Sequence, residues 1–254
     1  MPLPAKLSND NRLPILDPHG KRASMSSSIE KKTRVKKADE VAAAPEGTRR
    51  LAREDREQLI VQKAIKYFAT YGFGASTRDL AKEIGVSQPL LYRYFPNKEA
   101  LADRVFQEVY LSRWNPDWED ILRDRARPLV DRLLEFYQQY GRVILKSDWI
   151  RIFIFAGLTR EGINNRYLAR LRERIFDVIL AELRRQYKIA DPTPQQYEDE
   201  IEFIWGLHAA IFYVGVRKWV YGLQVPKDLD RLIDQHVHAF LDSAPAVLKR
   251  IRKG

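Results

Sequence analysis

The sequence predicts an all-α protein with a short helix-turn-helix domain followed by a larger helical domain. Apolar residues recur at spacings of three and four from Glu54 almost to the C-terminus, which is the period of one helix face. No segment alternates polar and apolar residues as a half-buried strand does. Two helical stretches of only about two turns each lie between Thr77 and Leu101, and helices this short are marginal in isolation.

Residues 1–53 are predicted to form a basic, disordered tail. They are rich in Pro, Ser, Lys and Ala, and their cluster EKKTRVKK shows little periodicity. Such a composition buries too little apolar surface to offset the entropy of ordering. We expect the helix-turn-helix domain at 54–104 and the C-terminal domain at 105–254.

The net charge of +10 is concentrated towards the N-terminus. Residues 1–56 hold 13 basic and 8 acidic side chains, and residues 57–104 hold 7 and 5, so +7 of the excess precedes residue 105. This excess favours a polyanion as partner, either nucleic acid or an anionic membrane surface, although many basic proteins bind neither.

Capping residues define the two short helices. Ser76 is a good N-cap, and Asp79 has the position of the second residue of a capping box. Gly85 ends this helix because glycine readily adopts a left-handed conformation. Ser87 caps the next helix, and Pro89 is tolerated in its first turn. The spacing predicts a helix-turn-helix whose two helices cross nearly at right angles.

Longer helices on either side are expected to cover the apolar faces of the short ones. The first of them ends at Gly72, and the second runs from about 97 to 112. One face of the first is marked by the apolar residues Ile60, Ala64, Phe68 and Tyr71.

The outer face of the second short helix has the chemistry of a DNA reader. The segment 87–98 contains Arg93 and Lys98 and no acid. Gln88 can donate to and accept from the edge of adenine in the major groove, and arginine can bind guanine with two hydrogen bonds. Tyrosines such as Tyr92 and Tyr94, and lysine, can donate to phosphate. The alternative is a solvated helix face on which the tyrosines pack locally.

The stretch GFGASTRDLAKEIGVSQPLLYRYFPNKEAL resembles the DNA-binding domain of the TetR family of bacterial transcriptional repressors. The family pattern has Thr-x-x-x-Ile-Ala, then Gly-Val-Ser, then Leu-Tyr-x-His/Tyr-Phe and a later Lys. This chain has Leu80-Ala81, Gly85-Val86-Ser87, Leu91-Tyr92, Tyr94-Phe95 and Lys98 at the matching places, with Ser76 at the start of the pattern.

The resemblance implies two groups of contacts to a double-stranded DNA operator. Bases would be faced by Arg78, Gln88, Pro89 and Tyr92, and phosphates held by Thr77, Ser87, Tyr94 and Lys98. Arg93 belongs to the same predicted surface. Two positions depart from the family: Leu90 replaces a small or polar residue and offers only apolar contact, for example to a thymine methyl, and Pro89 stands where glycine is more frequent.

The remainder of the chain predicts further helices. Pro128, Asp148, the sequence DPTP and Pro226 punctuate them. Their expected ranges are 117–125, 128–146, 148–158, 164–187, 195–221 and 227–242.

Family members use the last two long helices of such a domain to form a dimer, and the sequence is compatible with this. The stretch FIWGLHAAIFYVGVRKW is apolar on nearly all sides, as for a helix buried between its own core and a partner, or for a purely internal core helix. The residues expected at a homodimer interface are Gly206, Ala209, Ala210 and Gly215, with Leu232 and Phe240 from the final helix.

The resemblance also implies a small-molecule ligand in this domain. Aromatic density around the segment WIRIFIFAGL suits an apolar pocket with few polar groups, or an ordinary aromatic core. The candidate ligand-binding residues are Tyr137, Trp149, Phe153, Phe155, Tyr167 and His208.

Several other classes of protein fit the sequence poorly. The chain contains no cysteine, which excludes disulfides and thiolate sites and permits a reducing cytoplasm. His236 and His238 are two apart on a helix and point to different faces, so no metal site is expected. No phosphate-binding glycine loop or nucleophile elbow is present, and we expect neither catalysis nor a cofactor.

The longest apolar stretch, 201–223, is interrupted by His208 and by two basic residues, which argues against a membrane span. We therefore expect a cytoplasmic, ligand-released repressor that binds a palindrome as a homodimer. The alternatives are an activator or a ligand-independent DNA-binding protein of the same fold, and, more distantly, a helical protein of the membrane surface.

Overall fold

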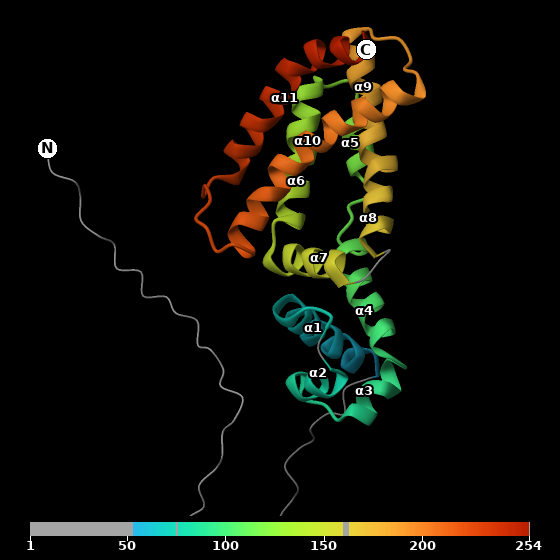
Figure 1. Ribbon diagram of the computed structural model, residues 1–254, viewed down its shortest axis with the longest axis vertical. Coiled ribbons are helices and arrows are strands. Elements are labelled where there is room, and N and C mark those ends of the chain that lie inside the picture. The colour runs from blue at the N-terminus through green and yellow to red at the C-terminus, as the bar shows by residue number, and fades with distance from the viewer. Residues whose placement is uncertain (1–52, 75, 160–162, 254) are drawn as a thin grey trace, which may run out of the picture. The chain divides into compact units, whose positions relative to one another are not determined.

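The computed structural model describes residues 53–74, 76–159 and 163–253, and every regular element in these ranges is helical (Figure 1). The all-α prediction is therefore confirmed for this part of the chain. The predicted tail, residues 1–53, lies outside the described residues except for Arg53, which begins the first helix.

The first described helices, from residue 53 to 106, are four in number and contain the predicted turn signals. Gly72 and Gly85 both adopt positive φ angles, 71° and 79°, at the ends of the helices that they were expected to terminate. The elements are α1 (Arg53–Tyr71), α2 (Thr77–Ile84), α3 (Gln88–Tyr94) and α4 (Lys98–Phe106), which continues into a π-helical turn, Gln107–Leu111.

The described residues after 111 add seven α-helices to these. One of the predicted helices, 164–187, is observed as α8 and α9 joined without a break by the π-helical turn Arg172–Phe176. The elements are α5 (Trp118–Arg123), α6 (Leu129–Ile144), α7 (Ser147–Thr159), α8 (Ile163–Leu171), α9 (Asp177–Tyr187), α10 (Pro194–Trp219) and α11 (Leu229–Ile251).

The expected end of the final helix, at residue 242, is wrong. Helix α11 continues to Ile251 and contains Pro245 in its interior. Proline lacks the N–H that would bond the carbonyl four residues earlier, which is that of Leu241. The hydroxyl of Tyr187, from α9, donates to this carbonyl at 3.0 Å. A tertiary hydrogen bond thus replaces the missing helical one, and the helix continues.

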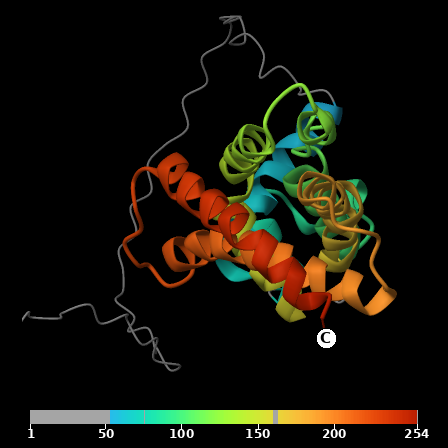
Figure 2. The ribbon, with the colours of Figure 1, turned by 90° about the horizontal axis from the view of Figure 1, so that it is seen from above.

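Helix packing joins the N-terminal helices to the C-terminal ones through a continuous set of buried apolar residues. Helix α1 packs against α2, α4 and α7, while α6, α10 and α11 pack against one another. Figure 2 shows α11, in red, lying across α10, in orange. No helix in the described part of the chain is long and apolar enough to cross a membrane.

Candidate nucleic-acid interface

Both ends of α2 are fixed by hydrogen bonds. The Ser76 Oγ accepts from the backbone N–H of Asp79 at 3.1 Å and donates to the Asp79 carboxylate at 2.6 Å. The Asp79 carboxylate therefore orients the Ser76 hydroxyl so that its oxygen can accept from the helix N–H. At the other end, Lys63 of α1 donates from Nζ to the carbonyl of Ile84 at 2.6 Å. The bond from Lys63 holds the end of α2 and the start of the turn against α1.

Helix α3 is placed by one cap and two buried anchors. The Ser87 Oγ accepts from the N–H of Leu90 at 3.3 Å, and Pro89 occupies the first turn as predicted. Leu91 and Phe95 are 2% and 5% exposed, so the inward face is the expected one. The opposite face of α3 is consequently left to solvent.

A chain of side-chain hydrogen bonds links the start of α2 to α3. Gln88 donates from Nε2 to the Thr77 Oγ1 at 3.2 Å, and the Thr77 hydroxyl and the Tyr92 hydroxyl lie 3.0 Å apart. Hydrogen bonding of the Tyr92 hydroxyl with Thr77 and, second, with Gln88 lowers the pKa of Tyr92, a residue that is 41% exposed. Two predicted base-reading residues are thus held together by a predicted phosphate-binding residue.

Basic residues flank this chain of hydrogen bonds. Arg78 and Arg93 are exposed, and the guanidinium of Arg93 lies 5.7 Å from the ring centroid of Tyr94. Helix α3 carries no acidic residue in its first turn, and Lys98 opens α4 behind the N-cap Asn97. The surface combines amide, hydroxyl and cationic donors, which suits base edges and phosphates.

Leu90, predicted to contact DNA, faces partly towards the protein interior. It is half-buried and lines a hollow of about 200 Å³ between α1 and the turn. Pro89 is exposed on the outer side. The other residues lining this hollow are Arg56, Leu59, Ile60, Lys63, Ile84, Gly85 and Val86.

Most of the candidate ligand-binding residues lie in one aromatic network. Trp149 stacks on Phe153 with ring centroids 4.9 Å apart and meets Tyr167 at 5.4 Å. Phe153 contacts Phe212, which stacks on His208. Tyr137 joins through Phe136 and Tyr140, the latter contacting His208.

Phe155 does not share these ring contacts. Phe155, on α7, packs against Gly72 at the C-terminal end of α1, where a Cβ added to the glycine would approach the Phe155 Cδ1 to 2.9 Å. Arg151, also on α7, lies beside the Phe155 ring at 5.9 Å from its centroid. Arg151 is not among the functional residues predicted from the sequence. Arg151 donates to the carbonyls of Ala69 and Thr70 in α1 and to that of Trp219 in α10. Its partners are backbone carbonyls far away in sequence, so no sequence pattern indicates them.

Four polar atoms in the aromatic network are buried without a hydrogen-bond partner among the described residues. They are the indole nitrogens of Trp118 and Trp149, the Tyr137 hydroxyl and the His208 Nδ1. Such orphaned groups are rare in native proteins because each forfeits its hydration. Burial lowers the pKa of His208 to about 4 and raises that of Tyr137.

The predicted interface residues divide into exposed and internal positions. Gly206 and Ala209 are exposed on α10, and Ala210 and Leu232 are half-buried. Gly215, in contrast, packs against Ile150 of α7, where an added Cβ would approach within 2.6 Å. Phe240 also packs internally, stacking on Phe203 with ring centroids 4.5 Å apart.

Comparison with known proteins agrees with this geometry. Residues 60–105 match the family model described as "Bacterial regulatory proteins, tetR family". The uncharacterised HTH-type transcriptional regulator YhgD of Bacillus subtilis is 43% identical over 91 residues, which cover 35% of this chain and 43% of YhgD. A class A tetracycline repressor of Escherichia coli is 36% identical over 70 residues, or 25% of this chain and 32% of the repressor. The chain thus matches less than half the length of these relatives.

Solved structures extend the similarity of fold to the C-terminal helices. A TetR-family transcriptional regulator from Streptomyces coelicolor aligns with a TM-score of 0.52 and 20% identity, covering 80% of this chain and 90% of the other. The TetR family regulator PfmR of Thermus thermophilus gives 0.53 and 18%, covering 72% and 97%.

The fold and its helix-turn-helix define an all-helical protein with an N-terminal DNA-binding domain within its described residues. Residues 60–105 match the DNA-binding domain of the TetR family of bacterial regulatory proteins, a family that is non-enzymatic.

Proposed function

We propose that this protein is a homodimeric DNA-binding transcriptional regulator that represses from a palindromic operator and is released by a small-molecule ligand. The observation that carries the DNA-binding part is the linked set of Gln88, Thr77 and Tyr92 on an exposed helix face flanked by arginines. Side chains already ordered before binding lose less entropy when they meet DNA. The other parts of the proposal draw on features of the C-terminal helices.

The DNA-reading roles can be tested by comparing two substitutions over a library of duplexes. Gln88→Ala should cost about 1–3 kcal/mol at the preferred site and relax the preference at one base position. Lys98→Ala should weaken binding to all sequences similarly and reduce the salt slope by about one. The measurement is the dissociation constant at several salt concentrations.

Lys227→Ala is a matched control for this experiment, since it removes the same charge from an exposed position before α11. It should leave both affinity and salt slope unchanged. If Gln88→Ala and Lys98→Ala shift all sequences alike, the division between base-reading and phosphate-holding residues is wrong.

Release by a ligand is supported by the aromatic network and by its connection to α1. The orphaned donors of Trp118 and Trp149 would gain partners from a ligand with acceptor atoms. Trp149 and Arg151 are both on α7, and Arg151 bonds the last turn of α1. A ligand that moves α7 would therefore move the reading domain, and ligand binding and DNA binding would oppose each other reciprocally.

A further inference from the structure

A second hollow lies where the link between α9 and α10 meets the end of α11, apart from the aromatic network. Its volume is about 570 Å³, within the range of small-molecule sites. The lining residues are Tyr187, Ile189, Ala190, Pro245, Leu248, Lys249, Arg252 and Lys253.

One wall of the hollow is apolar and fixed in position. Leu248 is fully buried, and the Tyr187 hydroxyl is held by the Leu241 carbonyl, which Pro245 leaves free. Ile189 continues this wall and packs against the core. The wall can therefore receive an apolar group without first having to be ordered.

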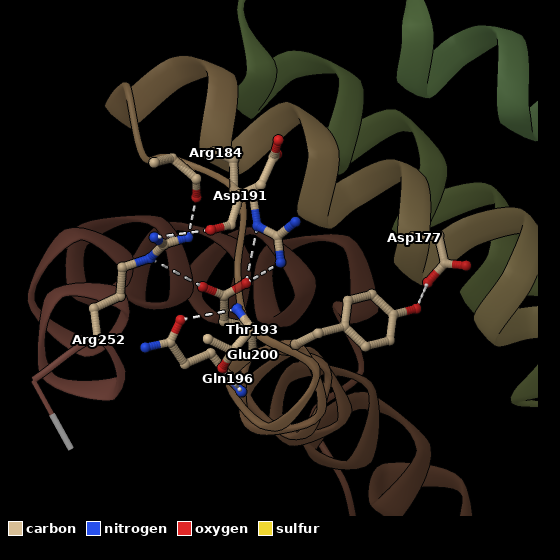
Figure 3. Close-up of polar contacts among 9 residues, drawn as sticks. Asp177, Arg184, Asp191, Thr193, Gln196, Glu200 and Arg252 are labelled. Atoms are coloured by element: carbon tan, nitrogen blue, oxygen red, sulfur yellow. Dashed lines mark hydrogen bonds and ion pairs between the residues drawn. The ribbon is translucent and has the colours of Figure 1, made fainter.

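The polar wall is organised by a buried carboxylate (Figure 3). Glu200 is 0% exposed and is bonded by the guanidinium of Arg184, while Arg252 lies on its other oxygen at 3.6 Å. Arg252 also donates to the carbonyls of Ala190 and Asp191. Its guanidinium is thereby held at the edge of the hollow.

The charge around this wall remains positive. Glu200 offsets only one of its two arginines, and Lys249 and Lys253 add two further cations at the rim. Neither lysine has an ion pair within the described part of the chain, and none of the lining residues is acidic. A basic rim beside an apolar wall is complementary to a molecule with one anionic end and one apolar end.

We propose that this hollow binds a small amphipathic organic anion, with its carboxylate at Lys249 and Lys253 and its apolar part against Tyr187, Ile189 and Leu248. The concave shape favours a single molecule over a membrane surface, which would meet an exposed amphipathic face. This site is independent of the aromatic network and of the proposed operator release. Occupancy would join the α9–α10 link to the end of α11 and so stabilise the folded protein.

The test is calorimetric titration of the full chain with decanoate, kept well below its micellar concentration. Decanol and acetate serve as probes of the tail alone and the head alone. We expect saturable binding of decanoate, with at least about tenfold weaker binding of either partial probe. Lys249→Glu/Lys253→Glu should weaken decanoate binding by about tenfold or more, since two attractive charges become repulsive.

Lys146→Glu/Lys227→Glu is the matched control, because it makes the same change in net charge at exposed positions outside the hollow. It should bind decanoate within about twofold of the unchanged protein. Ala190→Phe, which places a ring at the lining, should weaken decanoate binding while leaving the fold intact by circular dichroism.

Three results would overturn the proposal: equal binding of decanol and decanoate, equal loss in both double variants, or full binding in Ala190→Phe. Binding to anionic vesicles that the Lys249→Glu/Lys253→Glu change alone abolishes, without binding of free decanoate, would instead assign this face to a membrane. Operator affinity in the absence of decanoate should be unchanged in every variant, so failure here is separate from failure of the proposed DNA-binding function.

Discussion

At the scale of single residues, burial determines how His208 responds to pH. His208 is 6% exposed, and its ring lies against the aromatic rings of Tyr140, Phe176, Trp205 and Phe212. A charged imidazole there would lose its hydration without gaining a partner, so the pKa falls from 6.5 to about 4. The histidine is consequently neutral when the protein is folded near neutral pH.

This shift predicts a loss of stability in mild acid. Because the folded pKa lies below the unfolded one, the unfolded chain binds more protons between about pH 6.5 and pH 4, and the free energy of unfolding falls as pH falls through this window. From pH 7 to pH 5 the contribution of His208 should drop by about 2 kcal/mol. Urea unfolding of the protein and of His208→Phe at both pH values measures it. An unchanged pH slope in the variant would show that His208 is not the group responsible.

At the scale of elements, α11 depends on a contact from another helix to continue past proline. The Leu241 carbonyl has lost its helical donor at Pro245 and bonds the Tyr187 hydroxyl instead. A half-buried carbonyl left without a donor costs about 1–3 kcal/mol. The last turns of α11, including Leu248, are thus coupled to α9.

A double-mutant cycle tests this coupling. Tyr187→Phe should lower the free energy of unfolding by about 1–3 kcal/mol, because it orphans the Leu241 carbonyl. In a Pro245→Ala background the same change should cost clearly less, since the restored N–H of residue 245 can bond that carbonyl. Denaturant unfolding of the four proteins gives the interaction energy. Equal costs in both backgrounds would mean that the hydroxyl does not replace the missing helical hydrogen bond.

At the scale of the whole molecule, the proposed dimer places constraints on α10. Gly206 and Ala209 are exposed on one side of this helix. Apart from its chain neighbours and the adjacent backbone of α10, no described atom lies within 4 Å of a Cβ built on Gly206. Small residues permit a close approach by a second copy, and a two-fold contact would pair this patch with itself. Two reading heads related by a dyad would then span half-sites about 34–36 Å apart or a multiple of it.

Ala209→Glu should therefore abolish dimerisation and weaken operator binding together, because a carboxylate buried at a close helix contact is costly. The half-buried Ala210→Glu should act in the same way. Ala181→Glu, at an exposed position of α9, is the control and should remain dimeric. Sedimentation velocity and operator titration of each variant are the measurements. If both single variants, Ala209→Glu and Ala210→Glu, are folded and still form dimers, the interface lies elsewhere.

The sequence by itself determined the features that depend on local chemistry. Gly72 and Gly85 end their helices because left-handed backbone is cheap for glycine, and Ser76 and Ser87 cap because their hydroxyls accept from nearby N–H groups. The apolar period likewise indicated the inward face of α3. These interactions join residues only a few positions apart, so they can be predicted from the sequence.

Only the tertiary structure decided the features whose partners are distant along the chain. Helix α11 continues beyond residue 242 because the Tyr187 hydroxyl bonds the Leu241 carbonyl. Gly215 is buried because the Ile150 side chain packs against it. Arg151 joins α1 to α10 by hydrogen bonds to backbone carbonyls of both helices. The hydrogen bonds of Thr77 with Gln88 and Tyr92 also needed the crossing of α2 and α3. Every residue has a backbone carbonyl, so the residue type does not reveal which carbonyl accepts a hydrogen bond. The distance between two residues along the chain also does not determine their distance in space. These contacts therefore cannot be predicted from a sequence pattern.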